Sequence, residues 1–182
     1  ARRRARRVPR RVRPRPVGAA PLRAAGPGGG MSEPGHRTEM QKVIPPRLLV
    51  PYLSGKRTII SGYVYRVQDC GGLASPAALV EALDLCFEGS ELTPEVPELY
   101  VLRWFARDID TYVVPYGPHM GGDWSDSPPF TGNGFTASRD QVVPQFHTMP
   151  MPIPAGARIV HLTGAGERPF AGYDGLTWRR AS

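Results

Sequence analysis

Arg66 is the side chain of this sequence best suited to binding an anion. It closes a segment, 58–67, that is rich in β-branched and aromatic residues and is typical of a strand. A guanidinium at the end of a rigid strand can present parallel N–H groups to a phosphate or a carboxylate. The same residue could instead be a surface charge or the ion-pair partner of a carboxylate, and Arg103 competes for the anion-binding role.

A second group of chemically useful side chains lies in a long segment without clear periodicity, 115–133. A loop of this length in a compact domain is often functional. Its Asp and His side chains could do acid–base work, but their spacing matches no defined metal-ligand pattern, and Gly, Asp and Ser are also ordinary turn residues. We therefore expect no metal. The residues concerned are Tyr116, His119, Asp123, Trp124, Asp126 and Phe130.

Three short stretches resemble the ADP-ribosyltransferase-like family of the Arg–Ser–Glu class. Tyr65-Arg66 is similar to that family's strand ending in Tyr-Arg, and Phe135-Thr136-Ala137-Ser138 is similar to its later Ser-Thr-Ser-type motif. The segment 154–159 resembles its late proline–glycine turn and strand. In addition, 116–118 and 134–135 resemble parts of toxin-type NAD glycohydrolases.

The resemblance implies NAD as the cofactor. Arg66 would grip the dinucleotide phosphates, and Thr136 and Ser138 would order the site beneath the nicotinamide ribose. No Glu lies between Ser138 and Gly156, where the family has its catalytic Glu, so the candidates for that position are Gln145, which we prefer, and Asp140. The aromatic residues expected to contact the nucleotide are Tyr65, Trp124 and Phe130.

Three functions therefore remain open. The first is an ADP-ribosyltransferase-like domain that binds NAD or a related nucleotide and transfers or hydrolyses at the nicotinamide ribose. The second is a non-catalytic protein-binding or regulatory module, with Trp124 and Phe130 anchoring the partner. The third is contact with nucleic acid through the basic residues 1–30.

The positive charge of the chain is concentrated at its beginning. Residues 1–30 contain ten Arg and no acidic side chain, whereas the remaining residues carry 13 basic and 16 acidic side chains, a net charge of −3. Residues 1–30 have no hydrophobic period and their like charges repel, so we expect a disordered arm. Residues 31–182 form one predicted domain. Since Met31 reads as an ordinary start, the arm could also be absent from the native protein.

The predicted domain is α+β, with a mostly antiparallel sheet in one piece or as two small packed sheets. Ser75-Pro76 begins the main helix, which we expect to run to Gly89. Residues 32–42 are expected to fray, and the prolines at 45–51 allow one short helical turn. Expected strands are 58–67, 98–105, 109–114, 157–162 and 173–179, of which 98–105 and 109–114 are expected to pair as a hairpin. We also expect a short strand or turn at 134–138 and extended chain at 150–154.

The remaining titratable side chains point to no metal site. His161 lies inside a predicted strand, where we expect a hydrogen-bonded structural role. Cys86 is expected on the buried face of the helix, and Cys86 and Cys70 form no CxxC pair and no disulfide framework. We favour a reducing compartment, hence a cytoplasmic protein, with non-classical secretion as the alternative. Since no apolar run approaches the roughly 20 residues of a membrane span, we expect no membrane partner.

Overall fold

The computed structural model describes residues 34–107, 109–115, 133–138 and 141–181. The chain divides into two units, Ala1–Ser32 and Glu33–Ser182, and every described residue belongs to the second. Most of the predicted loop, including Trp124 and Phe130, lies outside the described residues, as do the basic arm and Met31. The predictions made for these segments stay predictions.

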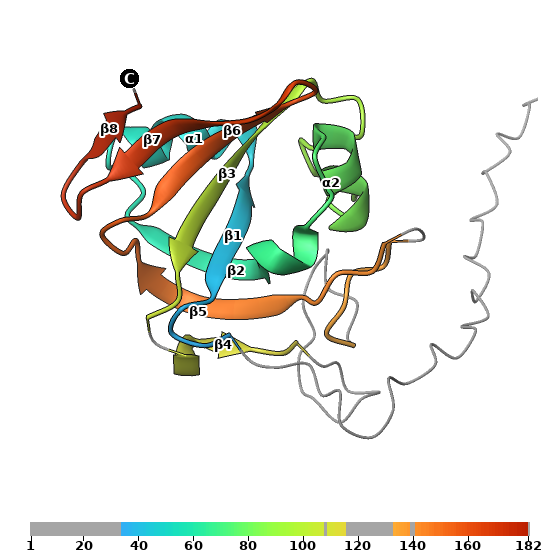
Figure 1. The fold of residues 1–182 in the computed structure, drawn as a ribbon, viewed down its shortest axis with the longest axis horizontal. Coiled ribbons are helices and arrows are strands. Elements are labelled where there is room, and N and C mark those ends of the chain that lie inside the picture. Colours follow the sequence, from blue (N-terminus) through green and yellow to red (C-terminus); the bar gives the residue numbers. More distant parts are fainter. Residues whose placement is uncertain (1–33, 108, 116–132, 139–140, 182) are drawn as a thin grey trace, which may run out of the picture. The chain divides into compact units, whose positions relative to one another are not determined.

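The second unit is built on one eight-stranded sheet in the order β4-β5-β2-β1-β3-β6-β7-β8, with every neighbouring pair antiparallel (Figure 1). The predicted α+β class with an antiparallel sheet is confirmed, in the one-sheet form. The strands are β1 (Glu39–Ile44), β2 (Ile59–Arg66), β3 (Glu98–Phe105), β4 (Tyr112–Val113), β5 (Phe146–Pro152), β6 (Arg158–Thr163), β7 (Gly166–Tyr173) and β8 (Trp178–Arg180). The helices are α1 (Pro46–Leu53) and α2 (Pro76–Ala82), with 3₁₀ turns η1 (Val67–Cys70) and η2 (Ile109–Thr111).

The prediction that residues 32–42 fray is wrong for 39–42, because these residues belong to β1, which lies in the middle of the sheet between β2 and β3. Met40 and Gln41 are almost completely buried there. The segment looks polar in isolation, and its burial comes from the strands on either side. Pro45 and Pro46 then end the strand, and Pro46 takes the first position of α1, where no backbone N–H is needed.

Strong local signals predicted several elements correctly. The segments expected at 58–67, 98–105 and 157–162 are β2, β3 and β6. Gly62 has a φ of +84° and lies at a register shift in β2, which is typical of a β-bulge. Ser75 caps α2 by accepting a hydrogen bond from the Ala78 amide at 3.2 Å.

Helix α2 ends earlier than predicted, at Ala82 rather than at Gly89. The chain turns immediately afterwards, with Asp84 at a φ of +51°. As a result Cys86 leaves the helical face and is exposed, which corrects the prediction of a buried thiol, whereas Cys70 is buried.

The predicted hairpin between 98–105 and 109–114 is also wrong. Both edges of β3 are already occupied, by β1 and by β6, so β4 pairs with β5 instead. The predicted strand at 173–179 is two strands, because β7 ends at Tyr173 and β8 begins at Trp178. Asp174 shapes the turn between them by accepting hydrogen bonds from the amides of Leu176 and Thr177.

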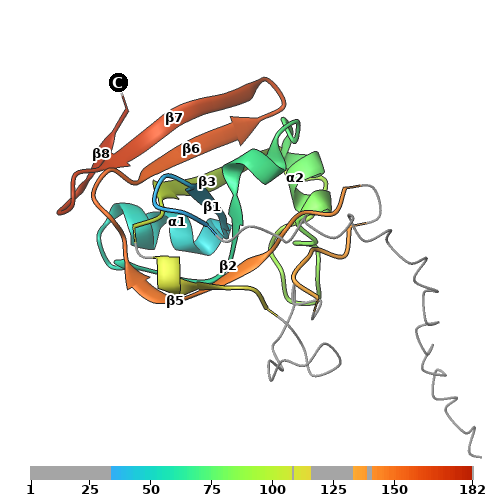
Figure 2. The same cartoon turned by 60° about the horizontal axis from the view of Figure 1, so that its bottom comes forward.

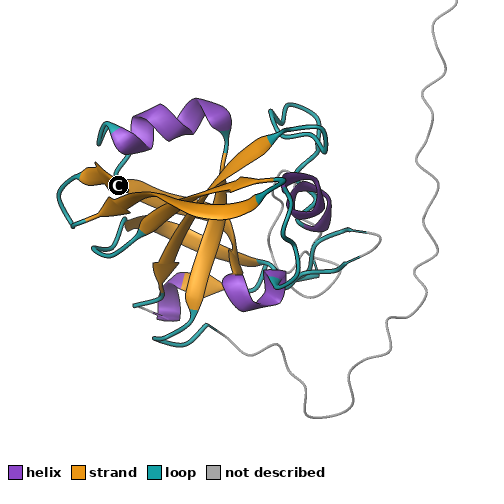
Figure 3. Ribbon diagram, turned by 45° about the horizontal axis from the view of Figure 1, so that its top comes forward, coloured by secondary structure: helices purple, strands orange, loops and turns teal. Residues whose placement is uncertain are grey.

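Side chains alternate between two cores on the two faces of the sheet. One face packs under α2, where Leu79 and Leu83 meet Val101 and Leu162. The sheet curves, with β6, β7 and β8 on one side and β2 and β5 on the other in Figure 2. In the core of the other face, Trp104 donates its indole N–H to the Tyr112 hydroxyl at 2.7 Å. Helices α1 and α2 lie at separate positions on the sheet (Figures 1 and 3).

Candidate functional site

A cavity opens where β1 and β2 separate. The two strands pair at Met40 with Arg66 and at Gln41 with Tyr65, and β1 then continues along β3. The cavity has a volume of about 250 Å³. Its described lining combines basic, aromatic and hydroxyl side chains from β1, α1, β2 and the segment after α2: Lys42, Val43, Pro45, Arg47, Leu48, Arg57, Ser61, Tyr63, Tyr65, Leu85, Phe87, Gly89, Ser90, Glu91 and Leu92.

Two cations of this cavity are held by neutral groups. The Nζ of half-buried Lys42 donates a hydrogen bond to the backbone carbonyl of Tyr63 at 3.0 Å, and the Nε of Arg57 donates to the Tyr52 hydroxyl at 3.0 Å. Within the part of the chain that the structure describes, neither cation has a carboxylate partner. Buried charges are normally paired, so the arrangement leaves positive charge available to a ligand.

The local environment lowers the pKa of Lys42 to about 8. Burial is the larger cause, because it removes the ammonium group from water, and the nearby Arg57 guanidinium is the second. Near neutral pH the amine is therefore mostly protonated but has a substantial neutral fraction. An anion placed between Lys42 and Arg57 would offset both causes and raise this pKa again.

Aromatic side chains form another part of the wall, from Tyr63, Tyr65 and Phe87. The Tyr65 hydroxyl donates to the Leu83 carbonyl at 3.5 Å and accepts from the Gln145 side-chain amide at 3.3 Å. Burial raises the pKa of Tyr65, so its phenol stays neutral at physiological pH. Flat apolar walls beside cations suit a ligand that carries both a ring and a negative charge.

Arg47 and Glu91 close the rim of the cavity. An Nη1 atom of Arg47 lies 3.2 Å from a Glu91 carboxylate oxygen, and the Arg47 amide donates to the other oxygen at 3.3 Å. Glu91 is the acidic residue of the described lining. Because Glu91 already pairs with Arg47, no carboxylate of the described lining is left to compensate the charge of Lys42 and Arg57.

Arg66, the first sequence candidate, lies elsewhere. It follows Tyr65 in β2 and therefore points to the opposite face of the strand. Its guanidinium is buried, binds both oxygens of Asp69 at 2.5 and 3.0 Å, and lies over the Phe146 ring at 5.4 Å. This is the ion pair that the sequence left open. A role for Arg66 in gripping phosphates stays a prediction.

Thr136 and Ser138 bond to nearby backbone. Thr136 is buried, and its hydroxyl accepts from the Val143 amide at 3.0 Å, while Ser138 accepts from the Gln141 amide at 3.4 Å. Of the sequence candidates, the structure brings together Tyr65 and the fully buried Gln145. It separates both from the Arg66 guanidinium, which occupies the other face of β2.

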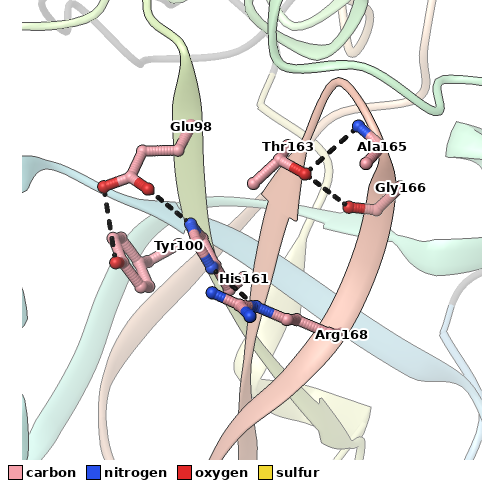
Figure 4. A network of polar contacts seen from close by, with 7 residues as sticks. All are labelled: Glu98, Tyr100, His161, Thr163, Ala165, Gly166 and Arg168. Atoms are coloured by element: carbon pink, nitrogen blue, oxygen red, sulfur yellow. Dashed lines mark hydrogen bonds and ion pairs between the residues drawn. The ribbon is translucent and has the colours of Figure 1, made fainter.

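His161 belongs to a network of polar contacts between side chains of β3, β6 and β7 (Figure 4). Its Nε2 lies 2.6 Å from a Glu98 carboxylate oxygen, its Nδ1 accepts from the Nε of Arg168 at 3.1 Å, and its ring stacks on Tyr100 at 4.7 Å. The predicted structural role of this histidine is confirmed. The Arg103 guanidinium also has partners: it donates one hydrogen bond to the Gln41 side chain and two to the Glu167 carboxylate.

Sequence reasoning missed Lys42, Arg57 and Glu91. Lys42 lies in a segment that was expected to fray, and the three residues are brought together only by the path of the chain around α1. No helix of the described chain is long and apolar enough to cross a membrane, and its His, Cys, Asp and Glu side chains form no group of three able to hold a metal. Comparison with protein-family models, curated proteins and solved structures finds no match for this chain.

Proposed function

We propose that this domain binds an anionic ligand of the nucleotide class in the cavity between β1 and β2. The observation that carries the proposal is the convergence of Lys42 and Arg57, which have no carboxylate partner among the described residues, on a cavity walled by Tyr63 and Phe87. A phosphate would lie on the two cations. A base or other flat ring would lie against the aromatic side chains.

The volume limits the size of the enclosed part of the ligand. A cavity of about 250 Å³ is slightly smaller than the range of about 300–1,000 Å³ typical of sites for drug-sized molecules. It suits a mononucleotide, or one half of a dinucleotide whose other half extends beyond the cavity. NAD is the dinucleotide that we propose, in line with the resemblance of Tyr65-Arg66 and the Thr136–Ser138 segment.

A transfer or hydrolysis reaction at the nicotinamide ribose is the enzymatic form of this proposal. Such a reaction needs a group that stabilises the positive charge developing on the ribose. Glu91 supplies a carboxylate at the rim of the cavity. This enzymatic form is tested separately from binding by measuring, with chromatography, the nicotinamide that the wild-type chain and Glu91→Gln release from NAD.

Ligand-induced stabilisation tests the binding proposal. A ligand that binds the folded state alone raises Tm as its concentration exceeds Kd. We expect AMP, ADP-ribose and NAD to raise the Tm of the full chain, and adenosine, which lacks the phosphate, to raise it much less. If none of the four changes Tm at millimolar concentration, the cavity is not a nucleotide site and the proposal fails.

A further inference from the structure

The chain contains only two lysines, and they differ sharply in environment. Lys42 is half-buried and lines the cavity, whereas Lys56 is exposed in the turn after α1. One side-chain amine therefore meets any ligand of the cavity, and the other serves as an internal reference within the same molecule.

We propose that Lys42 is a carbonyl-reactive amine, which takes an aldehyde bearing an anionic group as an imine while Arg57 holds the anion. The proposal rests on the anion site proposed above and names a further class of ligand for it. Aromatic anionic aldehydes fit best, because Tyr63, Tyr65 and Phe87 wall the same space.

The reaction needs no oxidant or metal. The lone pair of the neutral amine attacks the carbonyl carbon, the nitrogen then loses one hydrogen as a proton, and the carbonyl oxygen takes up a proton, which gives a carbinolamine. Loss of water then forms the C=N bond, with the second amine hydrogen leaving as a proton. The product is one imine and one water, and hydrolysis reverses the reaction.

The environment of Lys42 supplies the neutral amine that this reaction requires. With the pKa of Lys42 near 8, about a quarter of the amine is neutral at pH 7.5, against about one part in a thousand for an ordinary exposed lysine. A less basic amine is also a weaker nucleophile. With a Brønsted slope of about 0.4–0.5, as for thiols, the remaining advantage is roughly ten- to twentyfold.

The two lysines can be compared directly by trapping the imine. The full chain is treated at pH 7.5 with pyridoxal 5′-phosphate, reduced with borohydride and digested with trypsin. Alkylation blocks cleavage, so Lys42 is found in peptide 38–47 and Lys56 in peptide 48–57. We expect labelling of Lys42 to be at least tenfold faster than labelling of Lys56, and the preference to fall severalfold with pyridoxal, which lacks the phosphate.

Variants separate the contribution of the amine from that of the anion site. Lys42→Arg keeps the positive charge and should remove the preferred adduct without changing Tm by more than a few degrees. Arg57→Gln should lower the preference for Lys42 over Lys56, and Lys56→Arg should leave the rate at which Lys42 is labelled unchanged. Equal labelling of Lys42 and Lys56 in the wild-type chain overturns the proposal.

Protection by nucleotide distinguishes this proposal from the proposed function. If Lys42 is labelled preferentially and AMP slows the labelling, both stand. If Lys42 is labelled preferentially but AMP neither binds nor protects, the amine proposal stands and nucleotide binding fails. If AMP binds by calorimetry and the two lysines react equally, the amine proposal fails and nucleotide binding stands.

Discussion

The Nζ of Lys42 lies 3.0 Å from the backbone carbonyl oxygen of Tyr63, across the gap between β1 and β2. The bond holds the amine in the cavity and gives it a neutral partner, so it does not cancel the charge. With Arg57 also bonded to a neutral hydroxyl, the same space holds two cations and the aromatic walls.

Replacing Lys42 should stabilise the empty protein. Its pKa is lowered from 10.5 in a solvated lysine to about 8 in the folded state, so below pH 8 the folded chain carries a poorly solvated ammonium. We expect Lys42→Met to raise the free energy of unfolding by about 1–2 kcal/mol at pH 7, after the loss of the bond to Tyr63.

The stabilisation by Lys42→Met should decrease as pH rises. Between pH 8 and 10.5 the folded amine loses its proton before the unfolded amine does, so the wild-type chain gains stability as pH rises. The advantage of Lys42→Met should therefore be full below pH 8 and shrink above it. Urea denaturation at pH 7 and pH 9.5 measures this, with Lys56→Met as the control. An advantage that grows with pH would contradict the account.

Binding of an anion should take up a proton. An anion near Lys42 favours the ammonium form, so its pKa rises from about 8 on binding, and affinity falls as pH rises through that value. Calorimetry of AMP binding at pH 8 in buffers of different ionisation enthalpy measures the proton count. We expect a fractional uptake that disappears in Lys42→Met. An uptake that persists in Lys42→Met would have to come from another group.

Arg66→Ala should destabilise the fold. If Arg66 gripped the dinucleotide phosphates, as the family resemblance implies, this substitution would remove nucleotide binding and leave the fold intact. The structure instead shows a buried ion pair whose side chains are 9% and 14% exposed for Arg66 and Asp69. Removing one partner of such a pair leaves the other uncompensated, and we expect a loss of about 3 kcal/mol in urea denaturation.

A matched control for that substitution is Arg37→Ala, which removes an exposed arginine and should cost little. If Arg66→Ala keeps wild-type stability and loses nucleotide binding, the role implied by the family resemblance is the correct one and the ion pair with Asp69 is incidental.

The two cysteines should react at very different rates. Cys86 is exposed, whereas Cys70 is buried and burial raises the pKa of its thiol to about 11. A thiol-specific chromogenic disulfide at pH 7.5 should modify one thiol quickly and the second only on unfolding. Peptide mapping should place the fast adduct on Cys86. Equal rates would mean that Cys70 is more accessible than the structure shows.

The strands with strong local patterns could be predicted from the sequence. Strands β2, β3 and β6 carry β-branched and aromatic residues that favour a strand whatever surrounds them. Strand β1 could not be predicted, because Gln41 is buried only through its neighbours in the sheet. The incorrect hairpin has the same origin, since the occupied edges of β3 are a property of the whole sheet.

The candidate site was predicted only in part, for a related reason. Tyr65 was found because it lies in a conspicuous strand, and it does line the cavity. Lys42 and Arg57 come from a short polar strand and from a turn, and no spacing in the sequence links them. Their shared cavity depends on the separation of β1 from β2 and on the path of the chain through α1.

Calorimetric titration of the full chain with AMP and NAD tests the central claim most directly. We expect saturable binding that weakens roughly tenfold, about 1.4 kcal/mol, in Arg57→Gln, and at least as much in Lys42→Met, with little change in Lys56→Gln. Absence of binding in the wild-type chain, or equal affinity in wild type and Arg57→Gln, would show that the cavity between β1 and β2 is not the ligand site.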